Sequence, residues 1–348
     1  MKVGIFTFPK SINYGAALQA TALQGTINSR GAEAFFIDHE CKAVTASDKL
    51  FDFKRALDLK YTIAHILNFP TAYKRIGKFK KFQRKHMSFV ADDPYLADVV
   101  VTGSDQIWNY NITGEDFDYF LDFPKNNLKK VSYAGSFGLS EIDPKYHEKL
   151  KTFFADFDAI SVREERAKEL IAEIAGLDST LVLDPTLLLK KADWEKYMAP
   201  AKDKGYIYVY TVFNSSTLWD FAYKLSEKTG LPIKTVSYSV THKYNAQCDY
   251  SAGPDDWLRY VSDADYVVTN SFHGVAFSIN FGKQFFFELP PAKSGVGSRL
   301  SNITARYGLS NRELSLADMD SKIDFSETEK LLEKDRTVSI DFIDGFLK

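Results

Sequence analysis

One histidine occupies the chemically most promising position in the sequence. Tyr266–Lys283, YVVTNSFHGVAFSINFGK, predicts a buried strand over Tyr266–Thr269, a polar turn over Asn270–Gly274, and then a helix that Gly282 ends. His273 lies where that helix begins, and backbone N–H groups at a helix start favour an anion. Because histidine moves protons near neutral pH, the turn predicts acid–base chemistry beside a bound anion. A hydrogen-bonded structural histidine is the alternative that position alone favours.

Further polar turns follow other predicted strands. They are Asn13-Tyr14-Gly15, Gly103-Ser104-Asp105-Gln106, Gly135-Ser136, Arg163-Glu164 and Ser298-Arg299. In a two-domain α/β protein such turns face a shared cleft, so they predict a ligand site. The candidate binding residues are Asn13, Tyr14, Gly15, Ser104, Asp105, Gln106, Ser136, Asn270, Ser271, Gly274 and Arg299. Arg163 suits bidentate capture of phosphate or carboxylate, and pairing with its acidic neighbours is an equally weighted alternative.

The order of the predicted elements indicates how these turns are positioned. The first half of the chain opens with strand, helix and strand over Val3–Phe8, Ala16–Ser29 and Ala34–Asp38. A second such series covers Tyr206–Val212, Leu218–Thr229 and Ile233–Val236. This alternation predicts an α/β fold of two Rossmann-like domains, each a parallel sheet flanked by helices. We expect these domains at residues 1–188 and 189–325, with a helix at 326–348 packing back on the first.

Composition excludes several classes of protein. The net charge of −2 gives no global signal for nucleic acid. Two cysteines, Cys41 and Cys248, argue against a disulfide framework, and the histidines show no metal-ligand spacing, so we expect a metal-independent reaction. The first ten residues read as a strand rather than a signal peptide, and no apolar run reaches the roughly 18 residues of a membrane span. A cytoplasmic protein is therefore expected.

A basic, helical insertion at about residues 51–90 interrupts the first domain. From Lys74 to Lys85 it holds seven Lys or Arg and no acid, and Tyr73, Ile76, Phe79 and Phe82 recur every three residues. One interpretation is a surface for anionic lipid or a lipid-linked diphosphate acceptor, with peripheral contact through residues 74–86 at the inner face of a membrane. The favoured interpretation is a solvated helix whose aromatic side chains face the core.

Six motifs together resemble the polysaccharide pyruvyl transferase family. They are, in order, NYGAALQ, VVVTGSDQIWN, YAGSFG, ISVREE, LDPTLLL and TNSFHGVAFSINFGKQF. The resemblance implies a fold similar to two-domain GT-B glycosyltransferases. It also implies transfer of a pyruvyl group from phosphoenolpyruvate to hydroxyls of a sugar or lipid-linked oligosaccharide, forming a cyclic ketal without a separate cofactor. His273 matches the family's C-terminal histidine and Arg163 its first-domain arginine, both of which surround phosphoenolpyruvate.

The C-terminal motif departs from the family pattern in one position. The family often has arginine, an aliphatic residue and histidine, whereas this chain has Ser271, Phe272 and His273. Ser271 cannot neutralise charge, which leaves Arg299 or Lys283 to supply it. Two other functions therefore stay open, a GT-B glycosyltransferase that uses a nucleotide-sugar and a catalytically silent saccharide-binding protein. On the acceptor side, Asp105 and Gln106 could orient hydroxyls, and Tyr14 or Trp108 could stack on a sugar, although core packing is favoured for Trp108.

Overall fold

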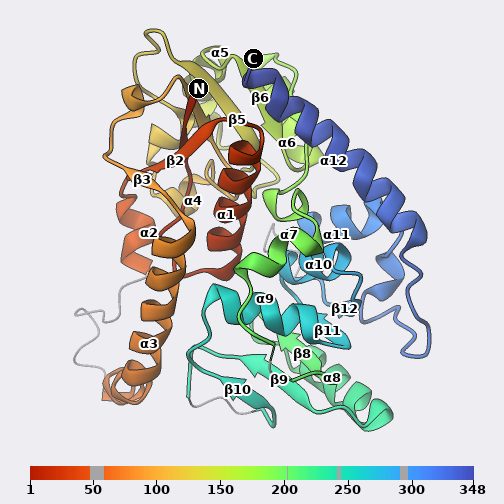
Figure 1. Cartoon of the computed structure of the whole chain (residues 1–348). Coiled ribbons are helices and arrows are strands. Elements are labelled where there is room, and N and C mark those ends of the chain that lie inside the picture. Colours follow the sequence, from red (N-terminus) through yellow and green to blue (C-terminus); the bar gives the residue numbers. More distant parts are fainter. Residues whose placement is uncertain (48–58, 202, 241–243, 291–296) are drawn as a thin grey trace. The chain divides into compact units, whose positions relative to one another are not determined.

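A computed structural model describes residues 1–47, 59–201, 203–240, 244–290 and 297–348 (Figure 1). The chain divides into two compact units. The first unit contains Met1–Asp48, His86–Leu189 and Lys330–Lys348, and the second contains Lys49–Lys85 and Lys190–Glu329. Each unit has its own parallel sheet with helices packed around it (Figure 1). The predicted α/β class, with two Rossmann-like parallel sheets flanked by helices, is confirmed.

The first unit is built on a seven-stranded sheet in the order β3-β2-β1-β4-β5-β6-β7. Its strands are β1 (Lys2–Phe6), β2 (Glu33–Ile37), β3 (Phe89–Val90), β4 (Val99–Thr102), β5 (Lys129–Gly135), β6 (Ala159–Val162) and β7 (Thr180–Leu181). Its helices are α1 (Tyr14–Ser29), α2 (Lys42–Ser47), α4 (Tyr110–Thr113), α5 (His147–Ala155), α6 (Glu165–Ala175) and α12 (Ser326–Phe346), with short 3₁₀ helices η2 (Pro94–Leu96), η3 (Phe117–Phe120), η4 (Pro144–Tyr146) and η5 (Pro185–Leu187). All strand pairs are parallel, and β4 is buried along its whole length, as expected for a strand covered on both faces.

The second unit is built on a five-stranded parallel sheet in the order β10-β9-β8-β11-β12. Its strands are β8 (Ile207–Tyr210), β9 (Ile233–Val236), β10 (Gln247–Asp249), β11 (Tyr266–Thr269) and β12 (Gln284–Phe287). Its helices are α3 (Leu59–His86), α7 (Lys191–Trp194), α8 (Ser216–Thr229), α9 (Pro254–Asp263), α10 (Phe272–Asn280) and α11 (Gly297–Arg306), with η6 (Glu195–Tyr197) and η8 (Ser310–Arg312). Ser215 caps the start of α8, and Gly230 ends it with a left-handed φ of 72°, which glycine adopts without strain.

The last helix, α12, contacts the first unit at several points. The backbone N–H of Leu183 donates to Ser339 Oγ at 2.9 Å, and Arg336 Nε donates to the carbonyl of Leu187 at 2.7 Å. Arg30 and Asp344 form an ion pair at 2.5 Å. These contacts attach the end of α12 to the segment after β7 and to the end of α1.

The basic insertion forms α3, which packs within the second unit. Phe79 and Phe82 are 0% and 3% exposed, whereas Tyr73 is 66% exposed, so the aromatic stripe that the sequence shows divides between the core and the surface. Residues 48–58 of the insertion lie outside the described part of the chain. Among the described residues, no helix is long and apolar enough to cross a membrane.

Candidate functional site

The His273 turn lies at the point where the strand order of the second sheet reverses. β8 is followed in the chain by β9 on one side and later by β11 on the other, so the turns after β8 and β11 are neighbours. Open α/β sheets bind ligands outside the carboxyl ends of strands at such a point. Asn270 joins the two turns, because its Oδ1 accepts from the N–H of Val212 at 2.8 Å and its Nδ2 donates to the carbonyl of Phe213 at 3.0 Å. The predicted binding residue Asn270 thus holds the rim of the site in place.

Ser271 is the cap of helix α10. Its hydroxyl accepts from the N–H of Gly274 at 3.4 Å, and its side chain is buried. Gly274 is required by close approach, since a Cβ there would lie 2.4 Å from Thr269 Oγ1. The serine that replaces the expected arginine therefore serves as the cap that begins the helix.

A cationic side chain lies near Phe272, the residue that precedes His273. The Phe272 and His273 rings contact each other edge to face, with centroids 5.2 Å apart, and the guanidinium carbon of Arg299 lies 5.9 Å from the Phe272 ring centroid. Arg299 is buried and belongs to the first turn of α11. Lys283 lies at the other edge of the sheet, where it donates to the carbonyl of Ala264 at 2.9 Å and where burial lowers its pKa. Of the two cations considered for the missing charge, only Arg299 lies at this turn.

The turn after β4 occupies the corresponding reversal point of the first sheet, between β1 and β4. Thr7, which follows β1, donates from Oγ1 to the carbonyl of Ser104 at 3.1 Å, and the Ser104 N–H donates to Gln19 Oε1 at 3.2 Å. Gly103 has a φ of 127°, and a Cβ there would lie 2.1 Å from the carbonyl oxygen of Tyr133. The backbone of this turn is therefore held tightly against its neighbours.

Arg163 is the centre of a buried cluster of carboxylates in the first unit. Its guanidinium lies 2.7 Å from Asp184 Oδ2, 3.3 Å from Asp105 Oδ1 and 3.7 Å from Glu164 Oε2. The Arg163 side chain is 2% exposed, and although burial opposes the charge, Asp105, Asp184 and Glu164 together raise its pKa. Asp105 is the most accessible of the three acids, with 18% of its side chain exposed. Three carboxylates from three different turns therefore contact this one guanidinium.

Other predicted residues have internal partners in the first unit. Asn13 caps α1 by accepting from the N–H of Ala16 at 3.1 Å, and Gly15 is buried in the next turn. The Tyr14 ring is 1% exposed, so it offers no face to a sugar in this conformation. These residues fix the start of α1 after β1.

Gln106 and Ser136 are likewise engaged with their surroundings. Gln106 Oε1 accepts from Asn109 Nδ2 at 3.0 Å. Ser136 is fully buried, and its hydroxyl donates to Glu164 Oε1 at 2.5 Å and accepts from the N–H of Gly138 at 3.1 Å. The turns after β5 and β6 are thereby linked at the carboxyl edge of the first sheet.

Trp108 belongs to the core of the first unit. It is 0% exposed and packs against the rings of Phe120, Phe137 and Phe154, and its indole N–H donates to the carbonyl of Tyr119 at 3.2 Å. Core packing is therefore confirmed, and the alternative of Trp108 stacking on a sugar is wrong.

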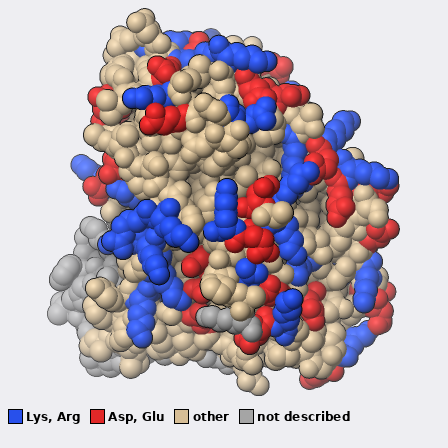
Figure 2. All heavy atoms as spheres, in the orientation of Figure 1, with Lys and Arg blue, Asp and Glu red and all other residues tan. Residues whose placement is uncertain are grey.

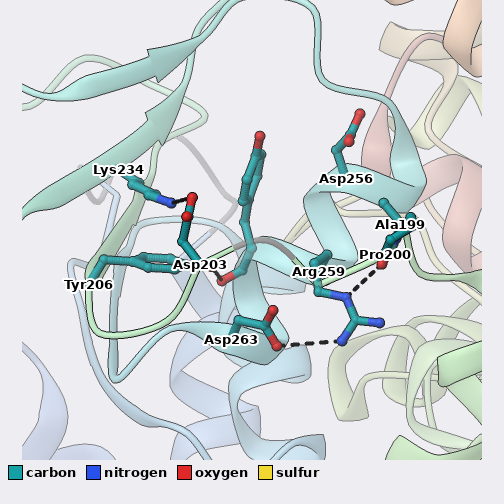
Figure 3. A pocket seen from close by; sticks show the side chains of 9 residues that line it. Ala199, Pro200, Asp203, Tyr206, Lys234, Asp256, Arg259 and Asp263 are labelled. Carbon is teal, nitrogen blue, oxygen red and sulfur yellow. Dashed lines mark hydrogen bonds and ion pairs between the residues drawn. The ribbon is translucent and has the colours of Figure 1, made fainter.

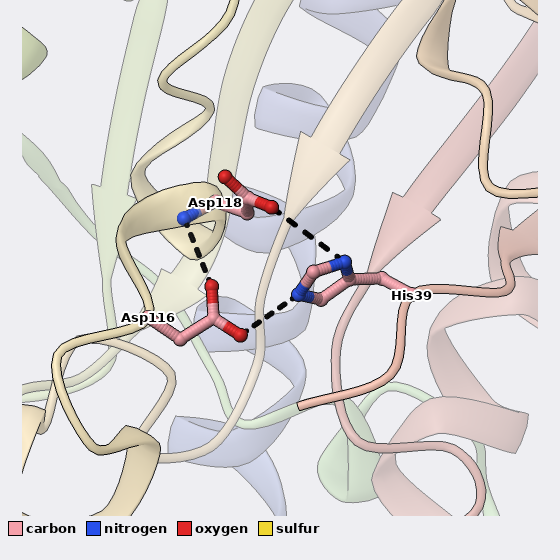
Figure 4. A group of neighbouring side chains, drawn as sticks. All are labelled: His39, Asp116 and Asp118. Carbon is pink, nitrogen blue, oxygen red and sulfur yellow. Dashed lines mark hydrogen bonds and ion pairs between the residues drawn. The ribbon is translucent and has the colours of Figure 1, made fainter. Parts of the chain in front are cut away.

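A histidine cluster that the sequence did not indicate lies beyond β2. His39 Nε2 lies 2.8 Å from Asp116, and its Nδ1 lies 3.7 Å from Asp118 (Figure 4). The same Nδ1 lies 3.3 Å from Asp92. His39, Asp116 and Asp118 offer ligand atoms of the types that hold divalent metals. However, the hydrogen bond to Asp116 is the main cause that raises the pKa of His39 to about 9, so near neutral pH the ring is a protonated ion-pair partner. A metal would have to displace that proton.

A second polar group lies at the amino edge of the second sheet (Figure 3). Arg259 donates to the carbonyl of Ala199 at 2.7 Å and contacts Asp263 at 3.5 Å, and Lys234 pairs with Asp203 at 2.7 Å. Since His273 follows the carboxyl end of β11, this pocket is separate from the His273 turn.

The architecture defines a class, the α/β proteins with two parallel, doubly wound sheets. The model of the polysaccharide pyruvyl transferase family matches residues 13–287. Because the match covers most of the chain, the protein belongs to the polysaccharide pyruvyl transferase family, a family of transferases. A comparison with curated protein sequences finds no significant match.

Several solved structures are similar to this chain at low sequence identity. A protein assigned as a UDP-N-acetylglucosamine 2-epimerase from Listeria monocytogenes has a TM-score of 0.50 and 11% identity, over 98% of this chain and 90% of that chain. A UDP-GlcNAc 2-epimerase from Neisseria meningitidis bound to UDP-GlcNAc has a TM-score of 0.46 and 10% identity, over 96% and 90%. An E. coli heptosyltransferase with ADP has a TM-score of 0.40 and 12% identity, over 96% and 100%. The first of these similarities supports the predicted fold class and nothing finer.

Proposed function

We propose that this protein transfers the pyruvyl group of phosphoenolpyruvate to two hydroxyls of a sugar in a surface polysaccharide or its precursor. The family match supports a transferase of this kind. The observation that carries the donor assignment is the grouping of His273, Phe272 and Arg299 at the start of α10. That grouping combines a proton-transfer side chain with a cation and with backbone N–H groups oriented for an anion.

Phosphoenolpyruvate fits this end of the second unit by charge. It carries a phosphate and a carboxylate, and the helix start offers backbone donors whose partial positive charge favours either group. Arg299 supplies the full positive charge that Ser271 cannot, and its guanidinium lies 5.9 Å from the ring centroid of Phe272, the residue before His273. The donor is therefore assigned to the carboxyl edge of the second sheet.

The acceptor sugar fits the first unit through hydrogen bonding. Asp105 is the most accessible of the three carboxylates around Arg163, and carboxylates accept hydrogen bonds from hydroxyl groups. Arg163 and the turn contacts of Ser104 hold Asp105 in its left-handed conformation, with a φ of 72°. We assign acceptor orientation to this carboxylate and to its neighbour Gln106.

In this proposal Arg163 positions Asp105 rather than binding a free anion directly. Its guanidinium already faces Asp184 and Asp105, so an anion would compete with these carboxylates for it. We assign Arg163 as a positioning residue for Asp105, and an anion contact by Arg163 during the reaction would appear as an effect on the KM for phosphoenolpyruvate.

The proposed reaction balances without a redox cofactor. Protonation of the methylene carbon makes the neighbouring carbon of phosphoenolpyruvate electrophilic, and the first sugar hydroxyl adds there as its own proton leaves. The second hydroxyl then displaces phosphate at the same carbon and loses its proton, and the departing phosphate takes up one proton. The product is a ketal whose central carbon carries a methyl group and a carboxylate. His273 serves one of these proton transfers, and Arg299 stabilises the negative charge of the donor.

Phosphate release from phosphoenolpyruvate in the presence of a panel of sugar acceptors tests the proposal. His273→Ala should lower kcat by about 10²–10⁴, the usual loss when a general acid or base is removed. Lys283→Met is the matched control, since Lys283 lies at the other end of α10 and should be dispensable. Near-full activity of His273→Ala would refute the catalytic role.

Ligand-induced stabilisation distinguishes the two other functions. Phosphoenolpyruvate should raise the Tm, whereas a nucleotide-sugar should not. The reverse pattern would favour a glycosyltransferase, and saccharide binding without any phosphate release would favour a silent binding protein.

A further inference from the structure

One face of helix α3 packs against the rest of the second unit. Phe79 and Phe82 are buried in it, and Arg75 Nη1 donates to the carbonyl of Tyr250 at 3.2 Å while its guanidinium lies 4.2 Å from the Tyr238 ring centroid. Lys78 pairs with Asp256 at 2.6 Å. These contacts fix the orientation of the helix about its own axis.

The opposite face of α3 is exposed and is divided along its length. Its first part is apolar, with exposed fractions of 63% for Ile66, 52% for Leu67, 46% for Phe69 and 66% for Tyr73. Its second part is basic and consists of the exposed side chains of Lys74, Lys80, Lys81, Arg84 and Lys85. At 3.6 residues per turn, all nine fall in a sector of about 160° that lies opposite Phe79 and Phe82. We call these nine residues the exposed α3 face.

The charge of the exposed α3 face is not balanced by its own helix. Leu59–His86 contains no Asp or Glu in its 28 residues. Figure 2 shows Lys and Arg side chains gathered on the surface over this helix. The chain as a whole has a net charge of −2, so this concentration of positive charge is local.

We propose that the exposed α3 face binds the surface of a membrane that contains anionic lipids. The lysines and arginine would lie among lipid phosphates, and Ile66, Leu67, Phe69 and Tyr73 would enter the boundary between headgroups and acyl chains. Phe69 and Tyr73 already stack with ring centroids 6.3 Å apart, which presents one continuous apolar surface. A nucleic acid would satisfy the basic part but would leave the apolar part in water, so the combination favours a lipid surface.

Vesicle sedimentation tests this inference without reference to pyruvyl transfer. The full-length protein should bind vesicles of phosphatidylcholine with phosphatidylglycerol and should not bind vesicles of phosphatidylcholine alone. A basic residue near such a surface strengthens binding about fivefold, so Lys80→Glu, Lys81→Glu and Arg84→Glu together should weaken it by at least about 100-fold. Raising the salt concentration should weaken binding by the wild type as well.

Two controls separate this face from general electrostatics. Lys151→Glu, Lys224→Glu and Lys322→Glu make the same change of net charge at exposed lysines elsewhere, and their binding should fall much less. Leu67→Ser with Tyr73→Ser should weaken binding at high salt, where the apolar contribution dominates.

Several outcomes would overturn the inference. They are equal binding to both kinds of vesicle, no vesicle binding, equal losses of binding in the triple variant of the exposed α3 face and the triple control variant, and binding to RNA without binding to vesicles. Unchanged circular dichroism and Tm of the surface variants would show that each loss concerns binding rather than folding.

Discussion

Replacing His39 by asparagine should change how the stability of the protein depends on pH. The pKa of His39 is raised from 6.5 to about 9, mainly by its hydrogen bond to Asp116, so the folded protein holds this proton more tightly than the unfolded chain. The stabilisation is fully present below pH 6.5 and is lost as the pH rises through about 9. A difference of about 2.5 pKa units between the folded and the unfolded protein corresponds to at most about 3.4 kcal/mol. Because Asp92 and Asp118 are 52% and 53% exposed, solvent screening reduces our expectation to about 2 kcal/mol.

Urea unfolding at pH 6 and pH 10, at constant ionic strength, measures this effect. The difference in free energy of unfolding between wild type and His39→Asn should be about 2 kcal/mol larger at pH 6 than at pH 10. Asp93→Asn removes a neighbouring carboxylate that caps η2 and does not face His39, so its difference from wild type should change little over that interval. A pH-independent difference for His39→Asn would refute the assignment of His39 as a protonated ion-pair partner.

Three further predictions concern the two switch-point turns. Gly103→Ala should destabilise the first unit by about 3 kcal/mol or more, because its Cβ would lie 2.1 Å from the Tyr133 carbonyl oxygen. The control Gly176→Ala, at a glycine with open space around it, should cost about 1 kcal/mol, and thermal unfolding of the two variants measures the difference. Asp184→Ala should destabilise by about 3–5 kcal/mol by breaking the buried pair with Arg163, and urea unfolding that shows less than about 1 kcal/mol would contradict the network. Arg299→Met should raise the KM for phosphoenolpyruvate at least about tenfold, an effect that steady-state kinetics would show and that Lys283→Met should lack.

Local patterns in the sequence were sufficient to predict the fold and the positions of several turns. The strands at Ile233–Val236 and Tyr266–Thr269 have the predicted bounds, because each is rich in β-branched residues and ends at a polar turn. Helix α10 begins at Phe272, one residue before the start that the sequence predicts at His273, because Ser271 acts as its cap. These features depend on residues close together in the chain.

The side-chain partners within each turn could not be predicted in the same way. The hydrogen bonds of Arg163 reach residues 21 and 58 positions away, and those of His39 reach residues 53 and 77 positions away. The local pattern around Arg163 indicates the pairing with its neighbour Glu164, but it does not show that Asp105 and Asp184 also contact the guanidinium. Likewise, the spacing of Ser271, Phe272 and His273 shows a missing arginine but not that Arg299 lies beside the Phe272 ring. The predicted cleft shared by all these turns stays a prediction.

The most direct test of the central claim is a comparison of wild type and His273→Ala with phosphoenolpyruvate and a sugar acceptor. Phosphate release and the ketal product, detected by mass spectrometry, should appear together and in equal amounts with the wild type. His273→Ala should retain binding of phosphoenolpyruvate, seen as a raised Tm, while its kcat falls by about 10²–10⁴. A ketal formed at the wild-type rate by His273→Ala would contradict the account, as would a wild type that binds nucleotide-sugars and never consumes phosphoenolpyruvate.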